Sequence, residues 1–152
     1  MLLAATAPQR ASAGACGVAL NPVLVLASGV SFGLYSPGAA TAATSSGTIT
    51  VTCTVVLGST LPSFSVALSA GTNGTFAQRK MAFGTARLNY NLYTSPALTT
   101  IWGDGTTPTM TQSYAASGGL ALTTFTVYGS VPTHQFSALG LFGDGITVTV
   151  TY

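Results

Sequence analysis

Apolar and polar residues alternate strictly over the last seven residues of the chain, 146–152. In an extended strand, successive side chains point to opposite faces. One face would therefore carry Ile146, Val148, Val150 and Tyr152, and the other would carry three threonines. Chain ends usually fray, so an apolar-faced strand at this place must either pair inside its own fold or be offered to another chain. We predict function from this strand.

The rest of the chain has a similar short-strand pattern. Runs of β-branched and aromatic residues are separated by short turn-forming sequences such as Ser36-Pro37-Gly38. No segment has helical periodicity. The alanine-rich segment 39–46 is expected to be a surface loop. At this length the pattern predicts a single all-β sandwich domain. Its strands are expected at 17–27, 30–35, 48–57, 63–69, 80–83, 86–93, 120–128 and 145–152.

Charged residues are nearly absent from the chain. The 152 residues include four Lys or Arg and two Asp, whereas 47% are apolar. A typical soluble protein has about a quarter charged residues, so this composition favours an exported protein that packs against other protein. No apolar run approaches the ~20 residues of a membrane-spanning helix. We therefore expect no membrane span, and the small net charge argues against nucleic acid as a partner.

The N-terminus has features of a signal peptide. Residues 1–7 are mostly apolar and Ala11-Ser-Ala13 fits a cleavage site, although no basic residue precedes the apolar stretch. We interpret residues 1–13 as the remnant of a signal peptide and residues 14–152 as the mature domain. Cleavage would remove Arg10 and leave three basic and two acidic residues, a net charge of +1.

Cys16 and Cys53 are the only cysteines. In an exported chain they predict a disulfide worth roughly 3–4 kcal/mol; two buried free thiols are the alternative. No metal site or cofactor is expected, because two cysteines and one histidine lack the spacing of a metal site. Two motifs contain Asp-Gly: Trp102-Gly-Asp-Gly105 and Phe142-Gly-Asp-Gly145. Each supplies a single carboxylate, which is too few ligands for a calcium site. They are interpreted as aromatic core residues before tight Asp-Gly turns.

No catalytic residues are predicted. His134 is the only histidine, and no serine lies in a G-x-S-x-G motif. A catalytic triad would require His134 to meet a serine and either Asp104 or Asp144. We interpret His134 instead as a polar loop residue, and we predict that the chain is not an enzyme.

Seven segments, taken in order, resemble the spore coat protein U domain, the family to which the archaic (Csu-type) chaperone–usher pilins belong. The resemblance covers residues 16–152. Each of the seven motifs is weak evidence alone, but together, in this order, they are strong evidence. The segments are Cys16, Phe32-Gly-Leu-Tyr-Ser-Pro37, Gly47-Thr-Ile-Thr-Val-Thr-Cys53, Leu88-Asn-Tyr-Asn-Leu-Tyr93, Trp102-Gly-Asp-Gly105, Val127-Tyr-Gly-Ser-Val-Pro132 and Gly140-Leu-Phe-Gly-Asp-Gly-Ile-Thr-Val-Thr-Val-Thr-Tyr152.

The resemblance implies an immunoglobulin-like β-sandwich that is incomplete, with one strand missing and supplied by a donor strand. In the family, a periplasmic chaperone lends that strand first, and the N-terminal extension of a neighbouring subunit lends it later. The implied partners are this chaperone, an outer-membrane usher and neighbouring pilus subunits. The implied location is an extracellular fibre reached through the periplasm. The last strand, with Ile146, Val148, Val150 and Tyr152, would border the accepting groove.

One departure from the family pattern lies at the N-terminus. A shaft pilin of the family carries a donor extension before its first cysteine, whereas only Gly14 and Ala15 would remain there after the predicted cleavage. The chain is therefore expected to receive a strand without lending one, as a terminal, adhesive subunit would. The alternative is a free-standing secreted β-sandwich that binds a carbohydrate or an apolar surface. A small secreted hydrolase is a third hypothesis.

Overall fold

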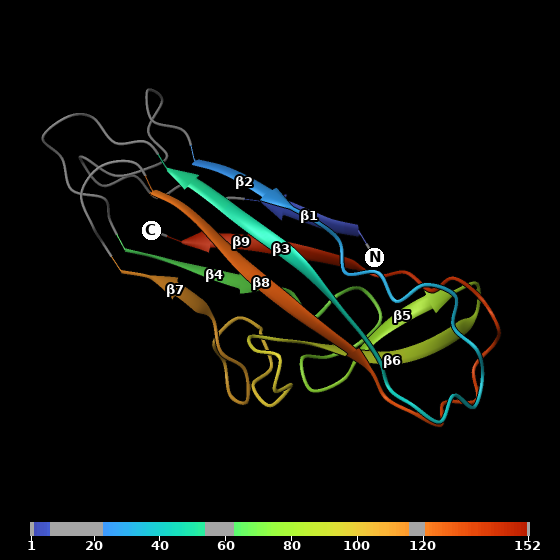
Figure 1. Cartoon of the computed structure of the whole chain (residues 1–152). Helices are drawn as coiled ribbons and strands as arrows, with labels where there is room; N and C mark the ends of the chain where they lie inside the picture. Colours follow the sequence, from blue (N-terminus) through green and yellow to red (C-terminus); the bar gives the residue numbers. More distant parts are fainter. Residues whose placement is uncertain (1, 7–22, 54–62, 116–120, 152) are drawn as a thin grey trace, which may run out of the picture.

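The computed structural model describes residues 2–6, 23–53, 63–115 and 121–151. Every regular element in these ranges is a β-strand, and the strands form two sheets that face each other (Figure 1). The strands are β1 (Leu2–Thr6), β2 (Val23–Ala27), β3 (Ala43–Cys53), β4 (Phe64–Leu68), β5 (Arg79–Phe83), β6 (Ala86–Tyr93), β7 (Gln112–Tyr114), β8 (Ala121–Val131) and β9 (Gly145–Thr151). The predicted all-β sandwich is confirmed. That a strand is missing stays a prediction.

The larger sheet has the strand order β2-β3-β8-β6-β5. Its centre is the antiparallel pair of β3 and β8, which are paired along the full length of both strands. The side chains of Ile49 and Val51 are buried in the core, whereas the intervening Thr50 points outward. On the outer face, the Thr50 and Thr124 hydroxyl oxygens lie 3.0 Å apart in a hydrogen bond. This alternation suits the β-branched residues that make up half of the pair.

The smaller sheet has the strand order β1-β9-β4-β7. β9 is antiparallel to β4 on one side and parallel to β1 on the other. Trp102, fully buried between the sheets, donates its indole N–H to the carbonyl of Val66 in β4 at 2.9 Å. The core therefore consists of the inward faces of both sheets around this indole.

Most predicted strands are found, with changes at their ends. The segment 86–93 matches β6, 63–69 contains β4, and 145–151 matches β9. β3 begins at Ala43, inside the predicted alanine-rich surface loop, so that part of the loop prediction is wrong. The predicted segments 17–22, 54–57 and 120, and Tyr152, lie outside the described residues.

The predicted strand 30–35 is wrong. Gly33 has a φ of 70°, which breaks an extended strand, and only Tyr35 forms an isolated bridge, to Gly140. Two strands were not predicted: β7, which has three residues, and β1, which lies in the segment interpreted as a signal remnant.

The two Asp-Gly motifs have different backbone conformations. Gly105 has a φ of 89°, as a tight turn requires, and Trp102 is a core residue, so this interpretation is confirmed. Gly145 instead begins β9 without a positive φ. The interpretation of Asp144-Gly145 as a left-handed turn is therefore wrong.

Candidate strand-accepting edge and apolar cavity

The predicted groove residues lie on β9, whose apolar face is turned into the core. Ile146, Val148 and Val150 are fully buried. They pack in the core cluster with residues of both sheets, and each fully buried aliphatic side chain contributes about 1.5–3 kcal/mol. Tyr152, the fourth predicted groove residue, lies outside the described residues.

The main chain of β9 has a second edge that does not face β4. Thr147 accepts a hydrogen bond from the Ser69 N–H at 3.0 Å and donates its own N–H to the Ser69 hydroxyl at 2.9 Å. The N–H and C=O of one strand residue point the same way, and the direction alternates along the strand. The peptide groups of Ile146, Val148 and Val150 therefore point away from β4. The residues that fill the core also present their main chain to the far edge of β9.

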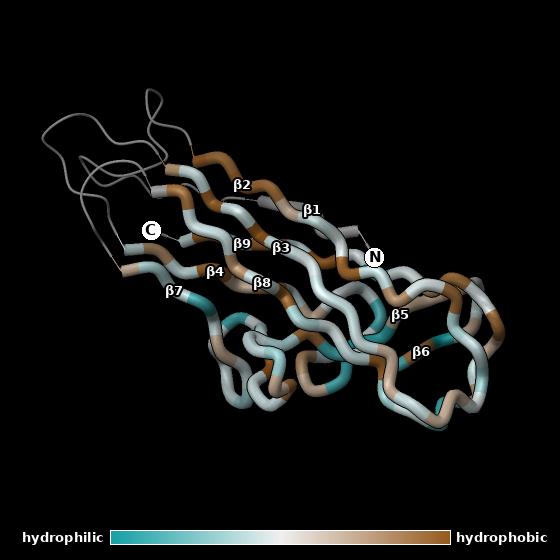
Figure 2. Tube along the Cα trace, viewed as in Figure 1, coloured by the Kyte–Doolittle hydropathy of each residue, from teal (hydrophilic) through white to brown (hydrophobic). Residues whose placement is uncertain are grey.

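β1 occupies this far edge. It runs parallel to β9, with Leu2 opposite Gly145 and Thr6 opposite Thr149. β1 also lies close to β2, the edge strand of the other sheet, which is apolar along its length (Figure 2). A five-residue strand from the far end of the chain thus closes the open side of the sandwich between β9 and β2.

Asp144 fixes the residue at which β9 begins. It is 6% exposed, and its carboxylate accepts hydrogen bonds from the Tyr90 hydroxyl at 2.7 Å, the Thr72 N–H at 3.0 Å and the Thr72 hydroxyl at 2.7 Å. The Gly145 N–H, the first of the strand, donates to the same carboxylate at 2.9 Å. Buried carboxylates need such donors to offset desolvation. The cluster ties the start of β9 to β6 and to the 69–72 loop.

A second buried charge, Arg79, holds the neighbouring segments. Its guanidinium donates to the carbonyl of Ser69 at 2.8 and 3.0 Å, to the carbonyl of Trp102 at 2.7 Å and to the Asn91 side-chain oxygen at 2.6 Å. Burial lowers the pKa of Arg79 to about 10, and the nearby Tyr90 and Asp144 partly oppose this change. Arg79 remains a cation at neutral pH, because its pKa stays well above 7.

Burial, and secondarily the hydrogen bond to Asp144, raises the pKa of Tyr90 well above its ordinary value of 10. Tyr90 should therefore not ionise while the chain is folded. Its contribution to the free energy of unfolding is fully present below pH about 10 and is lost as the pH rises further, because only the unfolded chain ionises there. Absorbance titration at 295 nm should show a tyrosine that ionises only when the folded chain unfolds. In Tyr90→Phe this tyrosine should be missing from the titration; ionisation of Tyr90 while the chain is still folded would contradict the prediction.

The residues considered for catalysis do not converge. His134 is exposed in a loop with a φ of 57°, and its ring has no hydrogen bond to any described serine or aspartate. Asp104 accepts hydrogen bonds from the Thr106 hydroxyl at 2.6 Å and the Thr106 N–H at 2.9 Å within its own turn. These bonds lower the pKa of Asp104. In the described ranges, no group of three or more His, Cys, Asp or Glu side chains could hold a metal ion.

Cys53 is fully buried at the end of β3, and none of the described residues is a free cysteine. Cys16 lies outside the described residues. The Cys16–Cys53 pairing stays a prediction.

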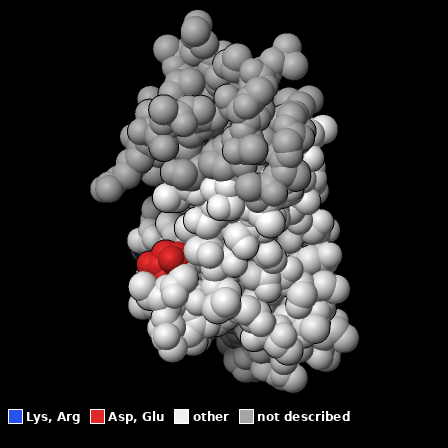
Figure 3. Space-filling view, turned by 90° about the vertical axis from the view of Figure 1, so that its left-hand side faces the viewer, with Lys and Arg blue, Asp and Glu red and all other residues white. Residues whose placement is uncertain are grey.

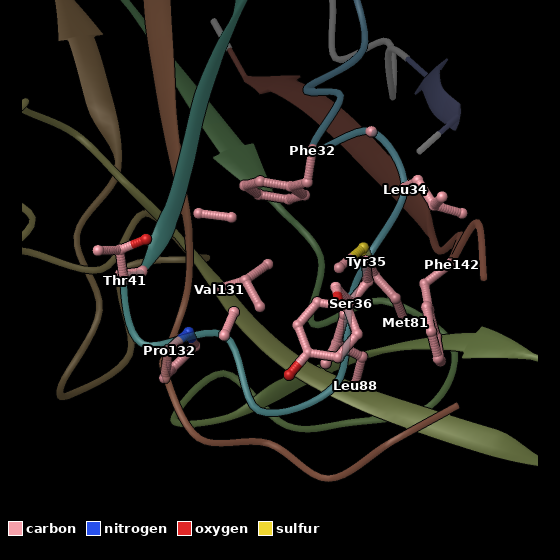
Figure 4. A pocket seen from close by; sticks show the side chains of 14 residues that line it. Phe32, Leu34, Tyr35, Ser36, Thr41, Met81, Leu88, Val131, Pro132 and Phe142 are labelled. Atoms are coloured by element: carbon pink, nitrogen blue, oxygen red, sulfur yellow. The ribbon is translucent and has the colours of Figure 1, made fainter. Parts of the chain in front are cut away.

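An apolar cavity of about 200 Å³ lies at the end of the sandwich next to β5 and β6 (Figure 4). The buried side chains of Met81, Leu88 and Val131 form its floor, and the Phe32 and Tyr35 rings flank it. Residues 32–35 belong to one of the seven segments that resemble the family, but their sequence predicts no cavity. No local signal could have found it, because its walls come from five separate segments.

Exposed apolar side chains surround this end of the molecule. We call four of them the apolar rim: Leu34, Phe83, Leu139 and Leu141, which are 64%, 48%, 60% and 66% exposed. The antiparallel bridges Tyr35–Gly140 and Ala82–Gly143 hold the rim segments together. Charge is sparse elsewhere too, and the face in Figure 3 shows one acidic spot on an almost uncharged described surface. Single exposed leucines are ordinary, whereas a contiguous apolar patch marks an interaction site, which makes the apolar rim a candidate interaction surface.

Comparison with known proteins gives a family and a fold. A sequence model of the Spore Coat Protein U domain matches residues 3–149. A solved structure with a similar fold comes from the CsuC–CsuE chaperone–tip adhesion subunit pre-assembly complex of the archaic chaperone–usher Csu pili of Acinetobacter baumannii. The TM-score is 0.54 at 20% sequence identity, and the match covers 88% of this chain but 40% of the other. No curated protein matches. The described residues contain no helix that could cross a bilayer.

Proposed function

Because this chain belongs to the Spore Coat Protein U domain family, we propose that it is a structural, non-enzymatic subunit of an extracellular chaperone–usher fibre. It would be exported through the periplasm and would join the fibre by accepting a strand along the far edge of β9, where β1 lies in this structure. The observation that carries this proposal is the parallel pairing of Leu2–Thr6 with β9. We interpret this segment as a stand-in for a strand that a partner supplies.

Two features of β9 support the proposal. Its buried valines line the core beside the accepting edge, and the peptide groups of the same residues point to that edge. An added strand would satisfy those peptide groups and cover the apolar space behind them. An unfilled edge of this kind would promote aggregation. The partners we propose are a periplasmic chaperone, an outer-membrane usher and neighbouring subunits.

Co-expression tests this function. With a chaperone encoded beside the gene, we expect the mature chain to form a soluble one-to-one complex, measured by size-exclusion chromatography with light scattering. Addition of a subunit's donor peptide should then displace the chaperone. A mature chain that stays a soluble monomer without either partner would instead favour the alternative function, a free-standing sandwich. The apolar rim is the observation that supports this alternative.

The proposed export predicts a disulfide between Cys16 and Cys53. The oxidising periplasm favours it, and Cys53 is fully buried in the sandwich. Intact-mass analysis of periplasmic material should show a gain of about two hydrogens on reduction. Cys53→Ser should lower the free energy of unfolding by roughly 2–5 kcal/mol. Two free thiols in freshly purified protein would refute the pairing.

The position in the fibre follows from the N-terminus of the mature chain. If cleavage follows Ala13, only Gly14 and Ala15 precede Cys16, whereas filling a groove takes about ten residues at ~3.3 Å each. The subunit should then cap a fibre without extending it, and mixing it with a chaperone-bound shaft subunit should give short, capped products. N-terminal sequencing of the secreted protein is the direct measurement. A mature chain that retains residues 2–6 would have a strand to lend, and the capping role would fail.

A further inference from the structure

The apolar cavity next to β5 and β6 has the form of a preformed ligand site. Its floor residues Met81, Leu88 and Val131 are at most 2% exposed, whereas Ser36 and Thr41 at its mouth are exposed. This space of about 200 Å³ is open at its mouth, so a small molecule can enter it, and such a molecule would gain packing contacts with the buried floor.

The wall chemistry defines that occupant. No charged side chain lines the cavity, so a charged ligand would find no counter-ion. Three aromatic rings do line it, those of Phe32, Tyr35 and Phe142, and the Met81 thioether belongs to its floor (Figure 4). The Tyr35 and Phe142 rings are edge to face at 6.0 Å. Aromatic edges and thioether sulfur both favour contact with another aromatic ring.

Two hydroxyls at the mouth add a polar contact. The side chains of Ser36 and Thr41 have no hydrogen-bond partner among the described residues. Each can donate or accept a hydrogen bond. A ring with one neutral polar substituent could therefore bury its apolar part on the floor and keep the substituent at the mouth.

We infer that this cavity binds a small, neutral, phenol-like aromatic molecule. The size agrees, since a dry apolar cavity of about 150 Å³ in another protein holds benzene. The inference does not depend on strand acceptance at β9, which lies along a different edge of the sandwich. It adds a ligand site to either a fibre subunit or a free-standing sandwich.

Methionine methyl NMR tests the inference on the full chain, or on its complex with the chaperone. Met81 is on the cavity floor, whereas Met110 is 57% exposed and does not line the cavity, so one spectrum contains both the reporter and its control. Titration with phenol should shift the Met81 methyl resonance to saturation, with a dissociation constant in the roughly millimolar range, and leave that of Met110 in place. Benzoate should bind at least about tenfold more weakly, because its carboxylate lacks a partner.

Two variants separate filling of the cavity from loss of the fold. Ala39→Leu places a larger side chain in the cavity wall and should weaken phenol binding at least about tenfold. Ala97→Leu, on an exposed loop outside the cavity, should not change it. If Ala39→Leu fails to fold, Thr41→Val at the exposed mouth should weaken binding of phenol but not of toluene. A Met81 resonance that does not move, equal non-saturating shifts of Met81 and Met110, or equal affinity for benzoate would each overturn the inference.

Discussion

Removal of residues 1–13 should turn a self-contained chain into one that depends on a partner strand. Without Leu2–Thr6, the peptide groups of β9 that point away from β4 lose their partner strand. A chain with so few charges has little repulsion to keep such edges apart. We expect chain 1–152 to be a monomer and chain 14–152 to aggregate or form ordered polymers, as measured by light scattering. A synthetic peptide of residues 1–9, added during refolding, should restore the monomer.

A paired substitution separates the strand from the length of the chain. The N–H groups of neighbouring strand residues point to opposite sides, so either Ala4 or Ala5 must donate to β9. The double variant Ala4→Pro, Ala5→Pro removes that donor and should behave like chain 14–152. The double variant Ala4→Val, Ala5→Val keeps the strand and should remain monomeric. A soluble monomer of chain 14–152 without any partner would count against strand acceptance.

Val148→Asp should abolish capture of the chain by its chaperone. Val148 is fully buried beside the accepting edge, and an unpaired carboxylate there should cost roughly 3–5 kcal/mol. Thr149→Ser, on the opposite face of the same strand, should change the free energy of unfolding by less than about 0.5 kcal/mol. Pull-down with the chaperone and urea unfolding measure the two effects. Equal losses from both variants would mean that the two faces of β9 are wrongly assigned.

A milder pair distinguishes the accepting edge from general core packing. Val148 in β9 and Val127 in β8 are both fully buried, but Val127 lies in the other sheet. Val148→Ala and Val127→Ala should each lower stability by a few kcal/mol. We expect Val148→Ala to slow donor-peptide uptake more than Val127→Ala does. The same rate for both variants would assign Val148 to the core alone.

The local sequence pattern was enough to predict the strands that turn one face to the core. In β9 and β6, one face meets the core, so apolar and polar residues alternate and the bounds can be predicted. The sequence has no helical periodicity and many turn sequences with Gly or Pro. These two features likewise predicted a sandwich. The segment 30–35 has the composition of a strand, but Gly33 adopts a left-handed conformation, and composition does not record φ.

Long-range pairing decided the features that matter most for the proposed function. Residues 2–6 have the composition of a signal-peptide core, and only their pairing with β9 at the other end of the chain makes them a strand. The burial of Arg79 is also invisible locally, because the acceptors that stabilise it come from Ser69, Asn91 and Trp102. The cavity joins residues that are more than a hundred positions apart, from Phe32 to Phe142. Alternation fixes which side of a strand is apolar, whereas partners, acceptors and cavity walls arise only when distant segments pack together.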